Sequence, residues 1–215
     1  MERKKTLSTI KKEKLLKKRL QNKDWAKKLK KATGKIIDPT LSSKIRFGYI
    51  YLLIDCSGSM AGSKIEQAKN GALGFADKAI SKGYSVGVIT FSTEATHLLA
   101  PVKIMDNIKT IITKFTAGGS TNMTSAIGIA TKNLENKFGE RVICIVTDGM
   151  PDNKMNAIKA TQIAKKKGIE IMTIGTDDAD KKFLEQLATK KELSIKVKRM
   201  KLGKAITDMA RLLAE

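Results

Sequence analysis

The sequence is poor in the residue types on which many enzymes and secreted proteins depend. It contains one histidine, two cysteines, three prolines and only 5% aromatic residues among 215. Cys144 lies in an apolar, strand-like run and Cys56 lies in a polar loop, so the sequence does not predict a structural disulfide. A nucleophilic Cys56 would need a nearby base. The only histidine, His97, has no second histidine or thiol at ligand spacing, and we expect it to be an ordinary strand residue.

Long apolar segments are also missing. No apolar run approaches the roughly 18 residues that a membrane-spanning helix needs. The first residues are basic but are not followed by the apolar segment of a signal peptide. From these two absences we expect a soluble, cytoplasmic protein that does not interact with a membrane.

Acidic residues are few relative to basic ones. The chain has 42 Lys and Arg against 21 Asp and Glu, a net charge of +21, and residues 1–46 alone contribute +13, from 17 basic and 4 acidic residues. This asymmetry predicts a lysine-rich N-terminal extension, 1–44, that is helical or disordered, followed by a domain at 45–215. The extension is either a solvated tail or an arm for RNA, DNA or an acidic protein, with Trp25 as its sole platform for base stacking.

The central feature of the sequence is an apolar run at residues 49–54 that stops on Asp55, Ser57 and Ser59. An unbroken apolar run of this length is typical of a parallel strand that is buried on both faces. The three polar residues alternate, so an extended loop turns their side chains the same way. Carboxylate and hydroxyl oxygens are ligands that suit a small, hard cation such as Mg²⁺.

A second apolar run, at residues 142–146, leads in the same way to Asp148. Two parallel strands that end on aspartates bring both carboxylates to one edge of the sheet, the edge at which open α/β sheets bind ligands. Strand patterns at 85–91, 94–100, 169–175 and 194–197 alternate with helical patterns, and Ser63 with Glu66 resembles a capping box at the start of the first helix. The predicted fold class is α/β: a doubly wound, mostly parallel, Rossmann-like sheet of about six strands with helices on both faces. The strand at 94–100 is the expected antiparallel edge strand.

The common phosphate and hydrolase motifs are not found. No phosphate-binding Gly-rich string follows the first strand, and neither Ser57 nor Ser59 lies in a Gly-x-Ser-x-Gly elbow. A serine hydrolase would depend entirely on His97 as its base. We therefore expect a protein that is not an enzyme.

Three segments of the sequence together resemble the metal-ion-dependent adhesion site (MIDAS) of von Willebrand factor A domains. They are Asp55-Cys56-Ser57-Gly58-Ser59, Gly118-Gly119-Ser120-Thr121 and Thr147-Asp148-Gly149. The resemblance covers about residues 45–215 and implies the fold of that family. The first segment, with the methionine that follows it, is similar to intracellular members such as the magnesium-chelatase large subunit and proteins paired with MoxR-type AAA+ ATPases.

The resemblance implies a set of metal ligands. Ser57, Ser59 and Thr121 would bind the ion through hydroxyls, and Asp55 and Asp148 would act directly or through water. One position would remain for a carboxylate from a partner protein. The implied ion is Mg²⁺, with Mn²⁺ or Ca²⁺ as alternatives. Three further residues near the same edge would support the ligands from an outer shell or contact the partner: Ser120, Asn122 and Asp152.

The resulting hypothesis is a cytoplasmic protein-interaction domain that binds an acidic residue of a partner through a divalent ion. The partner implied by the resemblance is an AAA+ ATPase of the MoxR type within a larger assembly. The alternative is a nucleic-acid-binding protein that uses the basic extension, with the domain as a scaffold. A third hypothesis is a structural module that has lost its metal, which the complete set of oxygen ligands disfavours.

Overall fold

The computed structural model describes residues 48–176 and 178–214. The chain divides into two units, residues 1–45 and 46–215. The described residues all belong to the second unit. The predictions made for the basic extension therefore lie outside the described residues, and they stay predictions.

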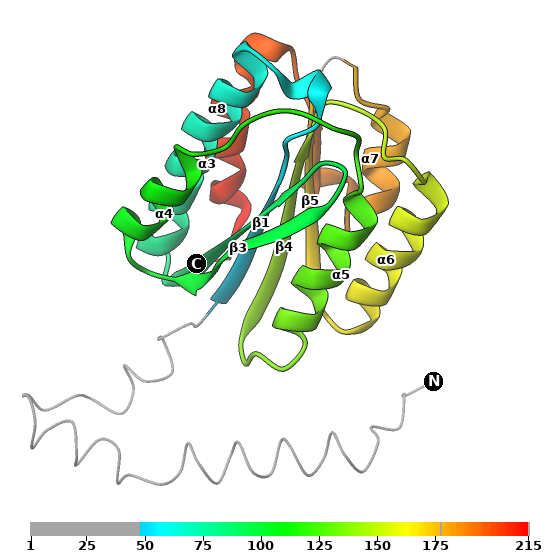
Figure 1. Cartoon of the computed structure of the whole chain (residues 1–215). Coiled ribbons are helices and arrows are strands. Elements are labelled where there is room, and N and C mark those ends of the chain that lie inside the picture. Colours follow the sequence, from blue (N-terminus) through cyan, green and yellow to red (C-terminus); the bar gives the residue numbers. More distant parts are fainter. Residues whose placement is uncertain (1–47, 177, 215) are drawn as a thin grey trace, which may run out of the picture. The chain divides into compact units, whose positions relative to one another are not determined.

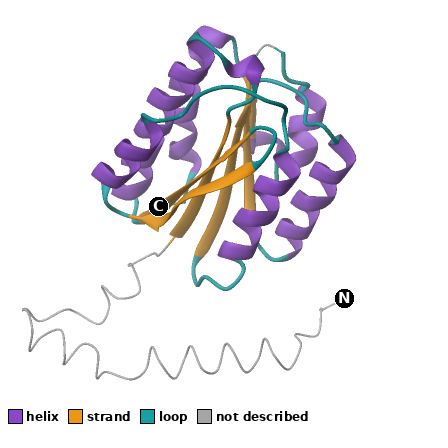
Figure 2. Cartoon of the chain, viewed as in Figure 1, coloured by secondary structure: helices purple, strands orange, loops and turns teal. Residues whose placement is uncertain are grey.

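A single six-stranded sheet forms the centre of the domain, with the strand order β3-β2-β1-β4-β5-β6 (Figures 1 and 2). β1 pairs in parallel with β2 and with β4, and β4, β5 and β6 continue the parallel arrangement. β3 pairs with β2 in the antiparallel direction at one edge. The predicted fold class is therefore confirmed, including the antiparallel edge strand. The strands are Gly48–Asp55, Tyr84–Phe91, Ala95–Val102, Glu140–Thr147, Glu170–Gly175 and Ser194–Lys196 for β1 to β6.

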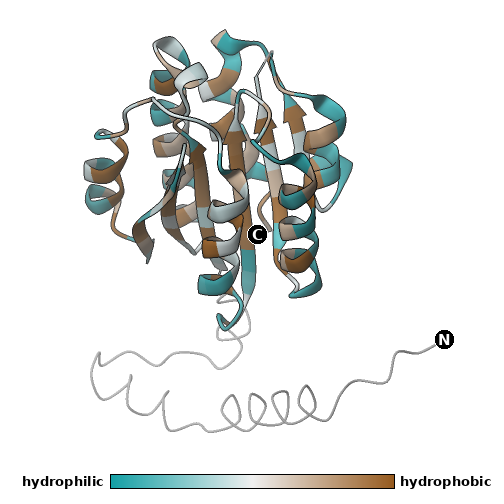
Figure 3. Ribbon diagram, turned by 45° about the vertical axis from the view of Figure 1, so that its right-hand side comes forward, coloured by the Kyte–Doolittle hydropathy of each residue, from teal (hydrophilic) through white to brown (hydrophobic). Residues whose placement is uncertain are grey.

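Helices cover both faces of this sheet, and this explains the unbroken apolar strands. In Figure 1, α3, α4 and α8 lie on one side and α5, α6 and α7 on the other, and Figure 3 shows the inner strands to be mostly hydrophobic. Successive residues of β1 enter two separate core clusters: Leu52 packs on the first side and Leu53 on the second, and both are fully buried. The helices are Ser63–Ser81 (α3), Met105–Ile112 (α4), Met123–Leu134 (α5), Lys154–Lys166 (α6), Lys181–Leu187 (α7) and Leu202–Met209 (α8).

The predicted capping box at the start of α3 is wrong. Ser63 is the first helical residue, and the capping position is occupied by Gly62, whose φ of 76° lies in the left-handed region. Ser63 and Glu66 cannot form the reciprocal pair because that pair requires the serine to precede the helix. A side-chain cap does form at α5, where Asn122 accepts a hydrogen bond from the amide of Ser125.

Three simpler expectations can also be compared with the structure. Cys56 and Cys144 are both free, as the sequence indicated, and both are buried. His97 lies on β3, as predicted, with its Nε2 at 2.8 Å from the hydroxyl of Tyr51. Within residues 48–176 and 178–214, every helix is too short or too polar to cross a bilayer.

Candidate metal site at the sheet edge

The two predicted aspartates lie at the carboxyl ends of neighbouring strands. The pairing of β1 with β4 extends to Ile54 and Val146. Asp55 then ends β1, and Thr147 ends β4 directly before Asp148. The side chains of both aspartates are fully buried. A buried carboxylate is costly unless it is hydrogen-bonded or paired with a cation, and the contacts of these two residues therefore define the site.

Asp55 is held by neutral donors. Its Oδ1 accepts the amide N–H of Ser57 at 2.8 Å, and its Oδ2 accepts the hydroxyl of Thr147 at 2.6 Å. Burial raises the pKa of Asp55, these hydrogen bonds oppose the rise, and the charge of Asp148 adds to it. A nearby cation would stabilise the ionised form of this carboxylate.

The two serines connect the first loop to Asp148. Their hydroxyl oxygens, Ser57 Oγ and Ser59 Oγ, are 3.0 Å apart, and Ser59 Oγ donates to Asp148 Oδ1 at 2.7 Å. Ser57 is buried, whereas Ser59 is exposed. The structure thus links three of the predicted ligand residues in one chain of oxygens that reaches the surface.

Thr121 lies on a second loop, which backbone hydrogen bonds hold against the first. The amide of Gly118 donates to the carbonyl of Cys56 at 2.8 Å, and the amide of Gly58 donates to the carbonyl of Gly119 at 3.0 Å. Gly119 has a φ of 82°, and a Cβ there would lie 2.5 Å from the hydroxyl oxygen of Thr93. A side chain at this position would therefore collide with the turn between β2 and β3 and displace the loop that carries Thr121.

The Thr121 hydroxyl is less closely connected to the other predicted ligands than the serine hydroxyls are. In the described part of the chain it forms no hydrogen bond with the other four predicted ligands, although its backbone is fixed on both sides. Its amide donates to Asp152 Oδ1 at 3.0 Å, and its carbonyl accepts the amide of Asp152 at 3.1 Å. The structure thus brings Ser57, Ser59 and Asp148 into contact, places Asp55 next to them, and places Thr121 on the adjoining loop.

The three residues predicted to lie around the site differ in their contacts. Asp152 joins the loop after β4 to the loop that carries Thr121. The side chain of Asn122 caps α5, and its backbone N–H donates to the carbonyl of Ser92 at 2.6 Å. Ser120 is exposed, and its amide donates to the Thr93 hydroxyl at 3.2 Å. Asp152 and Asn122 therefore position loops, and Ser120 is available at the surface.

Sequence reasoning missed Lys64, which lies in the first turn of α3 and reaches the same edge. Its Nζ is 2.5 Å from Asp148 Oδ2 and 2.9 Å from Asp178 Oδ2. Burial lowers the pKa of Lys64, but its hydrogen bonds to the two carboxylates outweigh this effect and raise it. Its partners lie 84 and 114 residues away, so only the assembled fold reveals the contact.

A second missed residue is Thr176, which follows β5 at the same end of the sheet. Its side chain is fully buried, and among the described residues its hydroxyl has no hydrogen-bond partner. A buried hydroxyl without a partner is uncommon in folded proteins. In the sequence, Thr176 is marked only by being a polar residue that follows an apolar strand.

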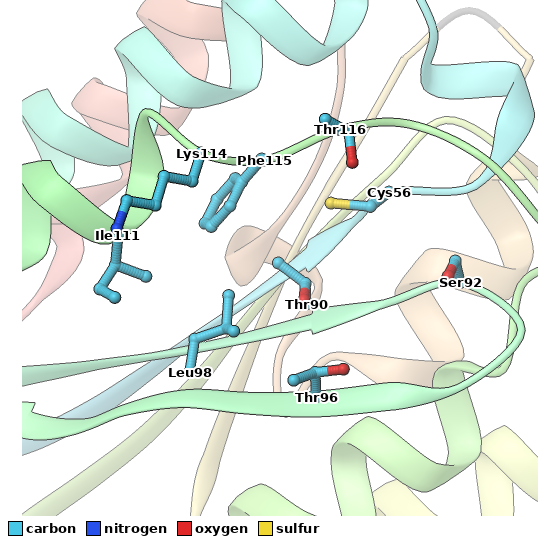
Figure 4. Close-up of a pocket in the computed structure, with 9 residues that line it drawn as sticks. All are labelled: Cys56, Thr90, Ser92, Thr96, Leu98, Ile111, Lys114, Phe115 and Thr116. Carbon is cyan, nitrogen blue, oxygen red and sulfur yellow. The ribbon is translucent and has the colours of Figure 1, made fainter.

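Beside the site, Cys56 lines a small pocket (Figure 4). This pocket measures about 290 Å³ and lies between α4 and the β2–β3 hairpin, with Thr90, Leu98 and Phe115 among its lining residues. Burial raises the pKa of Cys56 to about 12, and the neighbouring Asp55 adds to this rise. The thiol is therefore protonated at neutral pH and is a poor nucleophile and metal ligand.

The donor atoms gathered at this edge fit a hard divalent cation. They are carboxylate and hydroxyl oxygens, which hard cations prefer. The described residues hold no group of three or more His, Cys, Asp or Glu side chains that could bind a metal, so an ion here would depend on the two aspartates together with hydroxyls. Lys64 balances the charge of Asp148, whereas the buried carboxylate of Asp55 has no cationic partner among the described residues, and a bound cation would balance it. The fold and this edge define an open α/β domain with an oxygen-lined site at the carboxyl ends of its central strands.

Comparison with known proteins places that domain in a family. The family model of the von Willebrand factor type A domain matches residues 50–210, and the chain belongs to this family. A curated relative is the inter-alpha-trypsin inhibitor heavy chain H4 of Bos taurus, 30% identical over 157 residues. The match covers 65% of this chain but only 17% of that protein.

Solved structures share the fold at low sequence identity. The von Willebrand factor domain of the type V pilus tip protein Mfa5 from Porphyromonas gingivalis aligns with a TM-score of 0.71 at 14% identity, covering 78% of this chain and 95% of that one. Proximal thread matrix protein 1 from the mussel byssus, in a form described as having a zinc-occupied MIDAS motif, aligns with a TM-score of 0.67. Its identity is 22%, and the alignment covers 78% of this chain and 46% of that one. BatB from Bacteroides thetaiotaomicron aligns with a TM-score of 0.62 at 18% identity, covering 76% and 98%.

Proposed function

We propose that this protein is a divalent-metal-dependent protein-interaction module that binds a carboxylate of a partner at the edge formed by β1 and β4. Von Willebrand factor type A domains are typically interaction modules rather than enzymes, and this coarse assignment follows from the family. The observation that carries the finer proposal is the contact chain Ser57–Ser59–Asp148 next to the buried Asp55.

In this proposal Ser57, Ser59, Asp55 and Asp148 hold the ion, and Thr121 completes the set from the neighbouring loop. Bound there, the ion would supply an electrophilic centre for an incoming carboxylate. Because Ser59 and Ser120 are exposed, a partner can reach this edge without any rearrangement of the strands. We propose Mg²⁺ as the ion on the basis of its preference for oxygen ligands, with Mn²⁺ or Ca²⁺ as alternatives. The zinc-occupied site of the mussel protein supports a divalent ion in general.

The test is thermal unfolding of the full chain in chelator and in millimolar Mg²⁺. A ligand that binds only the folded state at 100 times its dissociation constant stabilises by about 2.7 kcal/mol. We expect the melting temperature of the wild type to rise with Mg²⁺ and that of Asp55→Ala not to respond. Asp77→Ala is the matched control, because Asp77 is an exposed aspartate far along α3. A wild type that responds no more than Asp55→Ala at any Mg²⁺ concentration would contradict the proposal.

The partner in this proposal is an AAA+ ATPase of the MoxR type in the cytoplasm. The support is the form of the first ligand segment and the two free thiols in the described residues. We expect such an ATPase to be retained by the wild type in Mg²⁺ and released by chelator or by Asp55→Ala. Retention that survives both treatments would show that the ion and Asp55 do not mediate the contact.

A second proposal concerns nucleic acid and rests on the charge of residues 1–46, which have a net charge of +13. Contacts between lysines and phosphates make the affinity fall steeply as the salt concentration rises. We expect deletion of residues 1–40 to abolish any binding of RNA or DNA and to spare metal-dependent partner binding. Equal nucleic-acid binding before and after the deletion would remove the extension from this role.

A further inference from the structure

Lys64 places a positive charge inside the candidate metal site. Only 7% of its side chain is exposed, and its Nζ lies between Asp148 Oδ2 at 2.5 Å and Asp178 Oδ2 at 2.9 Å. Lysine is seldom buried to this extent unless it is paired, since removing an ammonium ion from water is costly. The two pairs explain how the charge is tolerated there.

The two aspartates of the site differ in whether they are paired with a positive charge. Asp148 is paired with an ammonium ion, whereas the hydrogen bonds to Asp55 within residues 48–176 and 178–214 come from the neutral groups of Ser57 and Thr147. Lys64 occupies Oδ2 of Asp148, and the other oxygen, Oδ1, is the one that faces Ser59. Lys64 thus orients Asp148 and determines which of its oxygens is directed toward the serines.

Lys64 changes the net charge that the site has when an ion is bound. Asp55 and Asp148 together carry −2, so a divalent ion alone would bring a site without Lys64 to zero. With Lys64 in place, the same ion leaves an excess of +1. Asp178 and Asp152 offset part of this excess, but both are exposed, with 63% of the Asp178 side chain accessible, so solvent and salt screen their charges more than that of the fully buried Asp148.

We propose that Lys64 is a built-in counter-charge that weakens metal binding in the free protein and couples it to the arrival of a partner's carboxylate. The excess positive charge opposes the ion when it binds alone, and an incoming carboxylate removes that excess. The metal and the partner's acidic residue therefore bind cooperatively, each raising the affinity for the other by the same factor. This inference rests on the proposed function, since it assigns Lys64 as a positioning and affinity-setting residue of the same site.

The test measures Mn²⁺ binding to the full chain by the paramagnetic resonance signal of free Mn²⁺, with acetate as the carboxylate probe and chloride at equal ionic strength as its control. In chloride we expect Lys64→Gln to bind Mn²⁺ about tenfold more tightly than the wild type, equivalent to ~1.4 kcal/mol. Acetate should strengthen Mn²⁺ binding to the wild type and have little effect on Lys64→Gln. Glutamine keeps a hydrogen-bond donor for Asp148 while removing the charge.

Three further variants keep the test decisive if Lys64→Gln folds poorly. Lys64→Arg retains the charge and should bind Mn²⁺ like the wild type. Asp178→Asn removes a charge from an exposed side chain and should weaken Mn²⁺ binding, because Lys64 then loses its outer partner. Lys78→Gln, about 21 Å further along α3 and paired with Asp208, is the control for a general change in charge.

The outcomes separate this inference from the function on which it rests. Tighter Mn²⁺ binding by Lys64→Gln with a lost acetate effect supports the inference. Mn²⁺ binding that is equal in the wild type, Lys64→Gln and Asp178→Asn overturns it and leaves the metal site standing. A failure of every variant to bind Mn²⁺ at any concentration, with or without acetate, overturns both.

Discussion

Replacing either buried aspartate of the site should abolish metal binding, but the effects on stability should differ. Asp148 is the partner of a lysine whose side chain is 7% exposed, whereas Asp55 contacts neutral donors. Asp148→Asn leaves the Lys64 charge in the interior with only the exposed Asp178 as its counter-ion. Asp55→Asn removes a buried negative charge that Asp148 repels. We therefore expect a large loss of stability from the first substitution and little or none from the second.

The size of the loss follows from the burial of the pair. Removing one partner of a buried ion pair costs about 3–5 kcal/mol, and because Asp178 remains we expect about 3 kcal/mol for Asp148→Asn. In a domain of this size such a loss lowers the melting temperature by about 6–12 °C. The double variant Lys64→Gln with Asp148→Asn should recover most of the loss, since no buried charge is then left unpaired.

The assay is urea unfolding with chelator present throughout, so that metal binding cannot contribute to the free energy of unfolding. The wild type, the two single variants and the double variant are compared at one pH. Equal destabilisation by Asp55→Asn and Asp148→Asn would refute the reasoning, as would a double variant that is less stable than Asp148→Asn alone. Either result would mean that the Lys64 pair contributes little in the absence of metal.

Three further predictions concern pH, helix packing and thiol reactivity. Because burial holds the pKa of Asp55 above its usual value, the folded chain binds this proton more tightly than the unfolded chain. This contribution to stability is greatest at low pH and is lost as the pH rises through the pKa of the folded state. In metal-free melting curves, the resulting fall in melting temperature with rising pH should be present in the wild type and missing from Asp55→Asn. Gly71→Ala would place a Cβ 2.7 Å from a backbone oxygen of α8 and should destabilise by about 1–3 kcal/mol in urea unfolding. Gly128→Ala, on the exposed side of α5 with nothing within 4 Å, should be neutral or slightly stabilising, and a loss equal to that of Gly71→Ala would contradict the packing argument. Cys56, with a pKa of about 12 and a buried side chain, should resist iodoacetamide in the native protein and react in urea; rapid native labelling detected by mass spectrometry would contradict its assigned environment.

The parts of the site that were predicted from the sequence are those set by strand ends. An apolar run without alternation predicts a strand that is buried on both faces, and β1 and β4 are such strands, which the structure places in the middle of the sheet. Because both strands are parallel, Asp55 and Asp148 had to meet at one edge, where Ser57 contacts Asp55 and Ser59 contacts Asp148. Local sequence was enough here because each residue lies within a few positions of its strand.

The parts that were missed depend on contacts between distant segments or on backbone geometry. Lys64 looked like one of many lysines in a strongly basic chain, and its burial depends on Asp148 and Asp178 from two other loops. The capping box at Ser63 failed because Gly62 enters the helix with a positive φ, which the sequence pattern of serine and glutamate does not encode. Long-range charge pairing and single dihedral angles have no local signature.

The pairing of the two ligand loops gives the site a built-in spectroscopic reporter. The amides of Gly58 and Gly118 lie in exposed loops, where backbone protons ordinarily exchange with solvent quickly, yet both donate across the gap between the loops. Their exchange rates therefore measure how often the loop carrying Thr121 separates from the loop carrying Ser57 and Ser59. A ligand that draws the loops together slows both amides in concert, and one that forces them apart accelerates both, without any label at the site itself.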